Sequence, residues 1–209
     1  MPFQAEIKSD NYTKIIVWNL VETNEELLDQ LQLEEYRLEK YNTLTEKRKK
    51  EFLGIRMCLK YLGKNVDVLY DKKGRPYLDS DNHLSITHSH GKVAVGISRY
   101  KIGIDIEKKR DVKIQNIKQK FIRPDENFVA NFPELENDYL HIIWGIKESL
   151  YKLDGGEWWN FLLNYRTENF NLQDKYINCW ITKEIISNKY YAFWHMIDDF
   201  YLVIVVDYP

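Results

Sequence analysis

Hydrophobic and polar positions along the chain switch between a period of two and a period of about 3.6, which predicts strands and helices in turn. Residues 13–20 (TKIIVWNL) form a β-branched apolar run that predicts a strand. Residues 24–33 (NEELLDQLQL) have helical spacing, with Asn24 as the expected N-cap. A longer helix is predicted over residues 46–62, where apolar side chains recur every three or four positions after the capping residue Thr45.

The middle of the chain predicts strands followed by a second long helix. Residues 83–91 (HLSITHSHG) predict a strand that ends in polar residues. Residues 93–100 (VAVGISRY) and 102–107 (IGIDIE) predict the two arms of an antiparallel hairpin. Asp138 is the expected cap of a helix over residues 139–153, which a pair of glycines ends.

The end of the chain predicts three strands, at residues 176–185, 190–197 and 201–208. The order of strands, helix, hairpins, helix and hairpins predicts an α+β fold. Residues 53–63 and 144–154 align without a gap, and this echo favours two related halves. We therefore expect an N-terminal α+β half over residues 1–100 and a C-terminal half over residues 101–209, each with a small antiparallel sheet packed on a long helix.

Composition and charge narrow the classes of function. The 209 residues are 44% hydrophobic and 30% charged, with a net charge of −2, so no overall positive field attracts nucleic acid or an anionic membrane. Cys58 and Cys179 are the only cysteines and lie far apart in the sequence, which argues against a disulfide framework. They also lack the ligand spacing of a zinc site. The first residues show no leader pattern and no run is long enough to span a membrane. A cytoplasmic protein is expected.

Two acids share one face of the strand in GIDIE. Side chains alternate along a strand, so Asp105 and Glu107 lie on one side while Ile104 and Ile106 point to the other. Paired carboxylates suit Mg²⁺, which keeps several waters and then binds phosphate oxygens. The spacing alone equally fits an exposed strand face with solvated acids.

A third acid lies in the helix of WGIKESLYK. Glu148 and Lys152 are four residues apart and share a stripe with Trp144, with Lys147 beside it. This is a common pattern for a surface ion pair. It also fits a third metal ligand or general base flanked by lysines that bind an anionic substrate.

Possible phosphate donors precede these acids in the sequence. Thr87, His88 and Ser89 end a predicted strand, and no further ligand nearby would complete a zinc site, so hydrogen bonding to phosphate or ribose is favoured. Arg56 and Arg75 add forked donors that match phosphate geometry. Each of these residues, taken alone, has an ordinary structural interpretation.

Taken in order, the three motifs resemble those of the 4′-phosphopantetheinyl transferases of the long, surfactin-synthetase-type branch. That family has G-[KR]-P with an SHS-like turn, then G-[IV]-D-[IV]-E, then W-x-x-K-E-[AS]-x-x-K. The counterparts here are residues 74–76 with 87–89, residues 103–107 and residues 144–152. The match runs from about residue 47 to residue 152. Thr87 replaces the usual serine, and His90 stands where a glycine often follows.

The resemblance implies an enzyme that binds coenzyme A and Mg²⁺ between two pseudo-symmetric halves and transfers the phosphopantetheine arm to a carrier-protein serine. By position, the implied metal ligands are Asp105, Glu107 and Glu148, with Glu148 also the favoured base. The implied coenzyme A contacts are Lys147 and Lys152 at the phosphates, Arg56, Arg75, Thr87 and His88 at the nucleotide end, and more weakly Arg48.

The remaining expectations concern partners and alternatives. The implied partners are coenzyme A and an acyl or peptidyl carrier protein. Basic residues that would dock the acidic carrier are Lys113, Lys118 and Lys120. A monomer suffices if the two halves form the site. The alternatives are a Mg²⁺-dependent hydrolase of nucleotide pyrophosphates, a non-catalytic protein that binds coenzyme A or carriers, and a purely structural module.

Overall fold

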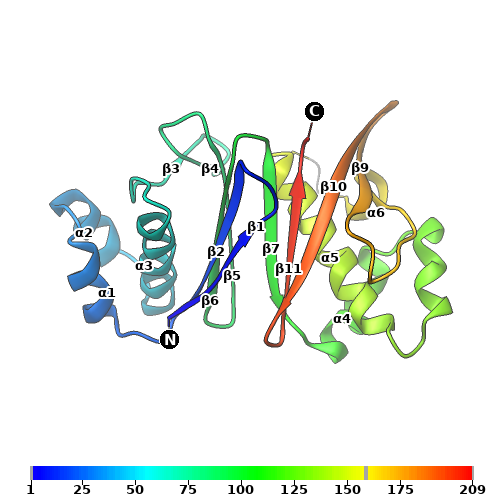
Figure 1. The fold of residues 1–209 in the computed structure, drawn as a ribbon, viewed down its shortest axis with the longest axis horizontal. Helices are drawn as coiled ribbons and strands as arrows, with labels where there is room; N and C mark the ends of the chain where they lie inside the picture. Colours follow the sequence, from blue (N-terminus) through cyan, green and yellow to red (C-terminus); the bar gives the residue numbers. More distant parts are fainter. Residues whose placement is uncertain (1, 158–159, 209) are drawn as a thin grey trace.

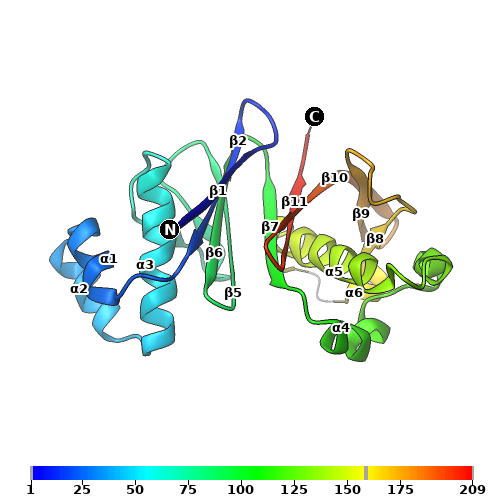
Figure 2. The same cartoon turned by 60° about the horizontal axis from the view of Figure 1, so that its bottom comes forward.

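The computed structural model describes residues 2–157 and 160–208, and it has an α+β fold with antiparallel sheets. The first sheet has the order β1-β2-β6-β5, and the second has the order β7-β11-β10-β9-β8. Figures 1 and 2 show the two sheets face to face in the middle of the molecule, with helices on both outer sides. This layered arrangement confirms the fold class predicted from the sequence.

The first sheet and its helices come from the first part of the chain. Its strands are β1 (Phe3–Lys8), β2 (Thr13–Asn19), β5 (His83–Ser89) and β6 (Lys92–Ser98). The helices are α1 (Asn24–Leu31), α2 (Glu35–Asn42) and α3 (Glu46–Tyr61). A short pair, β3 (Leu69–Tyr70) with β4 (Pro76–Tyr77), precedes β5. Apolar side chains of α1 and α3 pack on this sheet in one core cluster.

The second sheet and its helices follow. Its strands are β7 (Ile102–Lys108), β8 (Tyr165–Thr167), β9 (Ile177–Lys183), β10 (Ile186–Ile197) and β11 (Phe200–Val206). The helices are α4 (Asp111–Ile117), α5 (Glu136–Leu153) and α6 (Phe161–Asn164), with 3₁₀ segments η1 (Lys118–Lys120) and η2 (Pro124–Asn131). The long helix α5 packs on β7 and β11.

A third core cluster lies between the two sheets. It contains Ile15 and Val17 of β2, Ile104 of β7 and Leu202 of β11, each of them fully buried. Both faces of β7 and β11 are therefore covered, by the other sheet on one side and by α5 on the other. This explains why β11 is apolar at every position. In β7 the isoleucines alternate with Gly103, Asp105 and Glu107, and the isoleucines face the other sheet.

The predicted hairpin between residues 93–100 and 102–107 is wrong. β6 pairs with β2 and β5 in the first sheet, whereas β7 pairs with β11 in the second. The chain crosses between the sheets at Tyr100 and Lys101, because the isoleucine face of β7 is buried in the cluster between the sheets while its backbone pairs with β11. The boundary between halves at residues 100 and 101 remains a prediction, and this crossing point supports it.

Two helix starts also differ from the sequence-based prediction. The N-cap of α1 is Thr23, whose side chain forms a capping box with Glu26, and Asn24 is the first helical residue. Helix α5 begins three residues earlier than predicted, at Glu136, so Asp138 lies within its first turn. There Asp138 accepts hydrogen bonds from Lys109 and from the hydroxyl of Tyr201, which explains why it is not free to cap the helix.

Candidate active site

The candidate site lies where the edge strands β5 and β7 run side by side. Three hydroxyl side chains of β5, spaced two residues apart, bridge the sheets. Ser85 and Thr87 accept hydrogen bonds from the backbone N–H groups of Ile104 and Ile106, at 3.0 and 3.1 Å. Ser89 donates to Glu107, at 3.1 Å. The alternation of hydroxyl residues in HLSITHS is the sequence signal that could have indicated this junction, and the sequence analysis did not use it.

Helix α5 reaches this junction because Gly103 lets it approach β7. A Cβ atom at Gly103 would overlap the backbone carbonyl of Ser149. Only glycine permits this close contact between helix and strand. The glycine that opens GIDIE therefore brings Glu148 and Lys152 of α5 beside the acids of the strand.

Asp105 is the buried centre of the site. Its Oδ1 accepts hydrogen bonds from Lys152 Nζ, at 2.8 Å, and from the Thr87 hydroxyl, at 3.2 Å. Lys152 Nζ also donates to the carbonyl of Ile104, at 2.9 Å. Within the described part of the chain, the buried Asp105 Oδ2 has no hydrogen-bond partner. An unpartnered buried carboxylate oxygen is costly and is available to a cation or a donor group.

Glu148 faces Asp105 and Glu107 closely enough to interact with both charges. The pKa of the Glu148 carboxyl is raised to about 7, first by burial and then by the negative charges of Asp105 and Glu107, while the charge of Lys152 opposes the shift. A carboxyl group with this pKa can accept a proton near neutral pH, as a general base must. Glu148 thus lies near the two acids of β7.

The fit of the acids to a metal ion is partial. Among residues 2–157 and 160–208, no three or more His, Cys, Asp or Glu side chains are grouped in a way that could hold a metal. The donor set nevertheless suits a hard cation, because Asp105, Glu107 and Glu148 influence one another electrostatically and Asp105 keeps an unpartnered oxygen. A metal at these acids remains a prediction.

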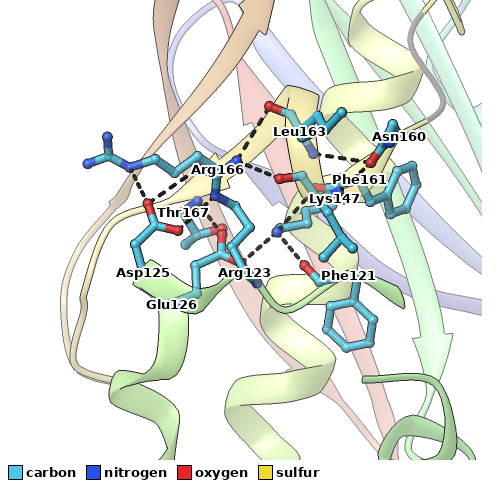
Figure 3. Close-up of polar contacts among 11 residues, drawn as sticks. Phe121, Arg123, Asp125, Glu126, Lys147, Asn160, Phe161, Leu163, Arg166 and Thr167 are labelled. Atoms are coloured by element: carbon cyan, nitrogen blue, oxygen red, sulfur yellow. Dashed lines mark hydrogen bonds and ion pairs between the residues drawn. The ribbon is translucent and has the colours of Figure 1, made fainter. Parts of the chain in front are cut away.

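Lys147 is not placed to contact a substrate phosphate, contrary to the sequence-based prediction. Its side chain is fully buried, and Nζ donates to Glu126 at 2.6 Å and to the carbonyl of Phe121 at 2.5 Å (Figure 3). Glu126 is equally buried and accepts the backbone N–H of Thr167, at 2.7 Å. Burial lowers the pKa of Lys147 to about 8, and Glu126 opposes this shift. Lys147 therefore ties η2 and β8 to α5.

The residues predicted for the nucleotide end line hollows along β5. A hollow of about 310 Å³ is lined by Arg48, Arg56, Ile86 and His88, together with apolar side chains that include Phe52 and Tyr70. Arg75 and Lys152 line an adjoining hollow of about 220 Å³, which shares Pro76 and Ile86 with the first. These adjoining hollows can accommodate an extended ligand that reaches from α3 to the acids.

Arg56 is buried to a degree that the sequence did not indicate. It is 4% exposed, its guanidinium lies over the Phe52 ring, and Nη1 donates to the Phe52 carbonyl at 3.0 Å. Among the described residues, its Nε has no hydrogen-bond partner. Burial lowers the pKa of Arg56 to about 10. A buried cation with an unused donor, at the wall of a hollow, can bind an anionic group.

A further hollow of about 580 Å³ lies on the other side of His88. Its lining includes Glu51, His88, Ser89 and His90. Glu51 was not among the residues predicted for the site, because an acid within the basic stretch EKRKKEF is expected to be a solvated surface residue. The structure buries it instead.

Comparison with known proteins agrees with this geometry. A family model described as the 4′-phosphopantetheinyl transferase superfamily matches residues 101–204, about half of the chain. The chain belongs to this superfamily. A 4′-phosphopantetheinyl transferase of Bacillus subtilis is 35% identical over 86 residues, which cover 39% of this chain and 38% of that relative.

Two further curated relatives give similar values. The 4′-phosphopantetheinyl transferase gsp of Aneurinibacillus migulanus is 32% identical over 96 residues, 44% of this chain and 40% of the relative. The 4′-phosphopantetheinyl transferase Sfp of Bacillus subtilis strain 168 is 31% identical over 85 residues, 39% of this chain and 38% of the relative. The aligned part thus spans about two fifths of each relative's length. These relatives bear out the resemblance seen in the sequence motifs.

Proposed function

We propose that this chain is a 4′-phosphopantetheinyl transferase that moves the phosphopantetheine arm of coenzyme A to a serine hydroxyl of an acyl or peptidyl carrier protein. The serine Oγ–P bond forms as the pyrophosphate P–O bond breaks, and adenosine 3′,5′-bisphosphate leaves. The observation that supports this most strongly is the half-buried Glu148 carboxyl, with a pKa of about 7, near Asp105 and Glu107 in a chain of this superfamily.

In this proposal Glu148 takes the proton of the carrier serine. Its raised pKa lets it hold that proton near neutral pH, whereas an ordinary surface glutamate would release it. Lys152 is 27% exposed at its side chain, so its ammonium can interact with the substrate phosphates while it remains paired with Asp105. Placement of the reacting groups and compensation of charge would supply most of the catalysis.

Asp105, Glu107 and Glu148 are the residues that would hold Mg²⁺. When bound, this ion would neutralise charge on the pyrophosphate. The unpartnered Asp105 Oδ2 supports the assignment. Lys147 is not proposed to contact the substrate phosphates, because its buried pair with Glu126 gives it a structural role.

The nucleotide end of coenzyme A is proposed to lie in the hollows along β5. Arg56 and Arg75 are the anion-binding candidates there. Arg48 and His88 line the same hollow as Arg56, and Thr87 lies at the junction with the acids, where it donates to Asp105. The aromatic and apolar lining, with Phe52 and Tyr70, suits a nucleobase.

The carrier is proposed to dock beside α4. Val112 is 78% exposed there, and Lys113 is exposed next to it. Lys118 is less suitable than predicted, because its ammonium already pairs with Glu136, at 3.0 Å. An exposed apolar residue next to a basic one fits the acidic, partly apolar surface of a carrier protein.

The proposed function is tested by following labelled coenzyme A. After incubation with Mg²⁺ and a panel of purified apo carriers, label on a carrier serine supports the transfer. Label released into solution, with carriers unmodified, would instead indicate a pyrophosphate hydrolase. Intact coenzyme A that binds without turnover would indicate a binding protein.

Within the described residues, no helix is long and apolar enough to cross a membrane.

A further inference from the structure

Glu51 is a buried acid at the wall between two hollows. It lies on α3, is 7% exposed, and lines both the hollow of about 580 Å³ and the hollow of about 310 Å³. His88 is the other residue that lines both. A carboxylate at this depth influences any charged group that enters either hollow, because solvent screens it poorly.

The partners of Glu51 are two residues proposed above for the nucleotide end of coenzyme A. Arg48 Nη1 lies 3.3 Å from Glu51 Oε2, and His88 Nδ1 lies 3.3 Å from Glu51 Oε1. One carboxylate therefore already lies within ion-pair distance of both side chains. A phosphate that binds Arg48 and His88 would lie beside a buried negative charge.

The lowered pKa of His88 is a second reason why a phosphate is disfavoured at this position. Burial lowers the pKa of His88, while the charge of Glu51 opposes this shift. A neutral ring that carries its proton on Nδ1, the nitrogen facing Glu51 Oε1, has Nε2 as an acceptor. Both side chains then offer acceptors, which match a hydroxyl donor and do not match a phosphate oxygen.

Other cations keep the hollows attractive to anions in general. Lys47 and Lys50 line the larger hollow, and Arg56 lines the smaller one. The effect of Glu51 is therefore local. It disfavours a dianion at Arg48 and His88, and it does not repel a pyrophosphate held elsewhere along β5.

We propose that Glu51 is a specificity-determining residue that lowers the contribution of the 3′-phosphate of coenzyme A to binding. 3′-Dephospho-coenzyme A, which has a free 3′-hydroxyl, should then be used as a donor with a kcat/KM similar to that of coenzyme A. This inference rests on the proposed function, since it concerns the donor substrate of the same site.

The test compares coenzyme A with 3′-dephospho-coenzyme A as donors. In the unaltered chain we expect kcat/KM values that agree within about fivefold. Glu51→Gln should raise the preference for coenzyme A about tenfold, because removing one nearby charge changes a poorly screened charge interaction on this order. The change should appear in KM with kcat maintained, since the 3′-phosphate is remote from the bond that breaks.

Matched variants separate the local charge from other effects. Glu51→Asp keeps the charge and should keep the near-equal use of the two donors. Glu39→Gln removes an exposed acid from α2 and should leave the ratio unchanged. Thermal unfolding of each variant checks that the fold is intact.

The outcomes distinguish the inference from the proposed function. Binding of both nucleotides by calorimetry, with a ratio that Glu51→Gln does not raise, overturns the inference alone. A loss of coenzyme A use in Glu51→Gln also overturns it, because Glu51 would then orient Arg48 and His88 for the phosphate. Failure to bind or transfer either donor overturns the proposed function together with the inference.

Discussion

The buried pair of Lys147 and Glu126 makes a quantitative prediction about stability. Both side chains are fully buried, their charged atoms are 2.6 Å apart, and Lys147 also donates to the carbonyl of Phe161, at 3.4 Å. Lys147→Met keeps the length of the side chain and leaves Glu126 buried without its cation. Breaking a buried pair from one side costs about 3–5 kcal/mol, because an uncompensated charge remains. Out of a total stability on the order of 5–15 kcal/mol, this is a large loss.

The matched control removes both charges. In Lys147→Met with Glu126→Gln, the amide oxygen of the new side chain can still accept the backbone N–H of Thr167, while the N–H of Arg123, which donates to the other carboxylate oxygen, loses its acceptor. We expect the double variant to recover most of the loss and to lie within about 2 kcal/mol of the unaltered chain.

The assay is urea unfolding of Lys147→Met, Glu126→Gln, the double variant and the unaltered chain, followed by tryptophan fluorescence. Trp144 is a useful local probe, because its ring lies 5.2 Å from that of Phe121 and 5.5 Å from that of Phe161. A Lys147→Met variant that loses less than about 1 kcal/mol would refute the reasoning. So would a double variant that is as unstable as the sum of the single ones, since the pair would then have no coupling.

The other predictions concern the acids, the lysine beside them and the carrier. In metal-free protein, the free energy of unfolding should fall as pH rises from about 5 to 7. The pKa of Glu148 is raised to about 7 in the folded state, so over this range the folded chain holds a proton that the unfolded chain has released. Unfolding measured against pH checks this, and Glu148→Gln should lack this contribution to the pH dependence. Mg²⁺ affinity measured by calorimetry should weaken as pH falls below about 7, because a proton competes for the same carboxylate; a pH-independent affinity would contradict the assignment. Lys152→Met should lower kcat by about 10–100-fold with the fold maintained, and an unchanged kcat would remove Lys152 from the phosphate site. Lys113→Glu should raise KM for the carrier several-fold, whereas Lys175→Glu should not; equal KM values would exclude docking beside α4.

The sequence was most informative where local pattern decides structure. The helices around Arg56 and Glu148, and the strands from residue 176 onward, follow from apolar spacing and from turn residues. Strand alternation and helix stripes predicted which acids of GIDIE and WGIKESLYK share a face, and Glu148 lies near enough to Asp105 and Glu107 for their charges to raise its pKa. The glycine at position 103 could be found in the motif, although its contact with Ser149 could not.

The sequence was least informative about long-range packing. Whether β7 turns back on β6 or joins β11 depends on a core cluster between the sheets, which local spacing does not encode. Lys147 has helical spacing that fits an exposed stripe, and only tertiary packing reveals its buried partner Glu126. Glu51 was missed for the opposite reason, since its basic neighbours suggest a solvated helix face, whereas the structure buries it beside His88 of β5.

The measurement that tests the central claim most directly is the intact mass of an apo carrier protein after incubation with this chain, coenzyme A and Mg²⁺. A parallel reaction contains Glu148→Gln, whose thermal unfolding confirms that it is folded. We predict a gain of one phosphopantetheine arm, roughly 340 Da, with the unaltered chain and none with the variant. An unchanged mass across several unrelated carriers, or an equal gain with the variant, would contradict the account of Glu148 as the base of a 4′-phosphopantetheinyl transferase.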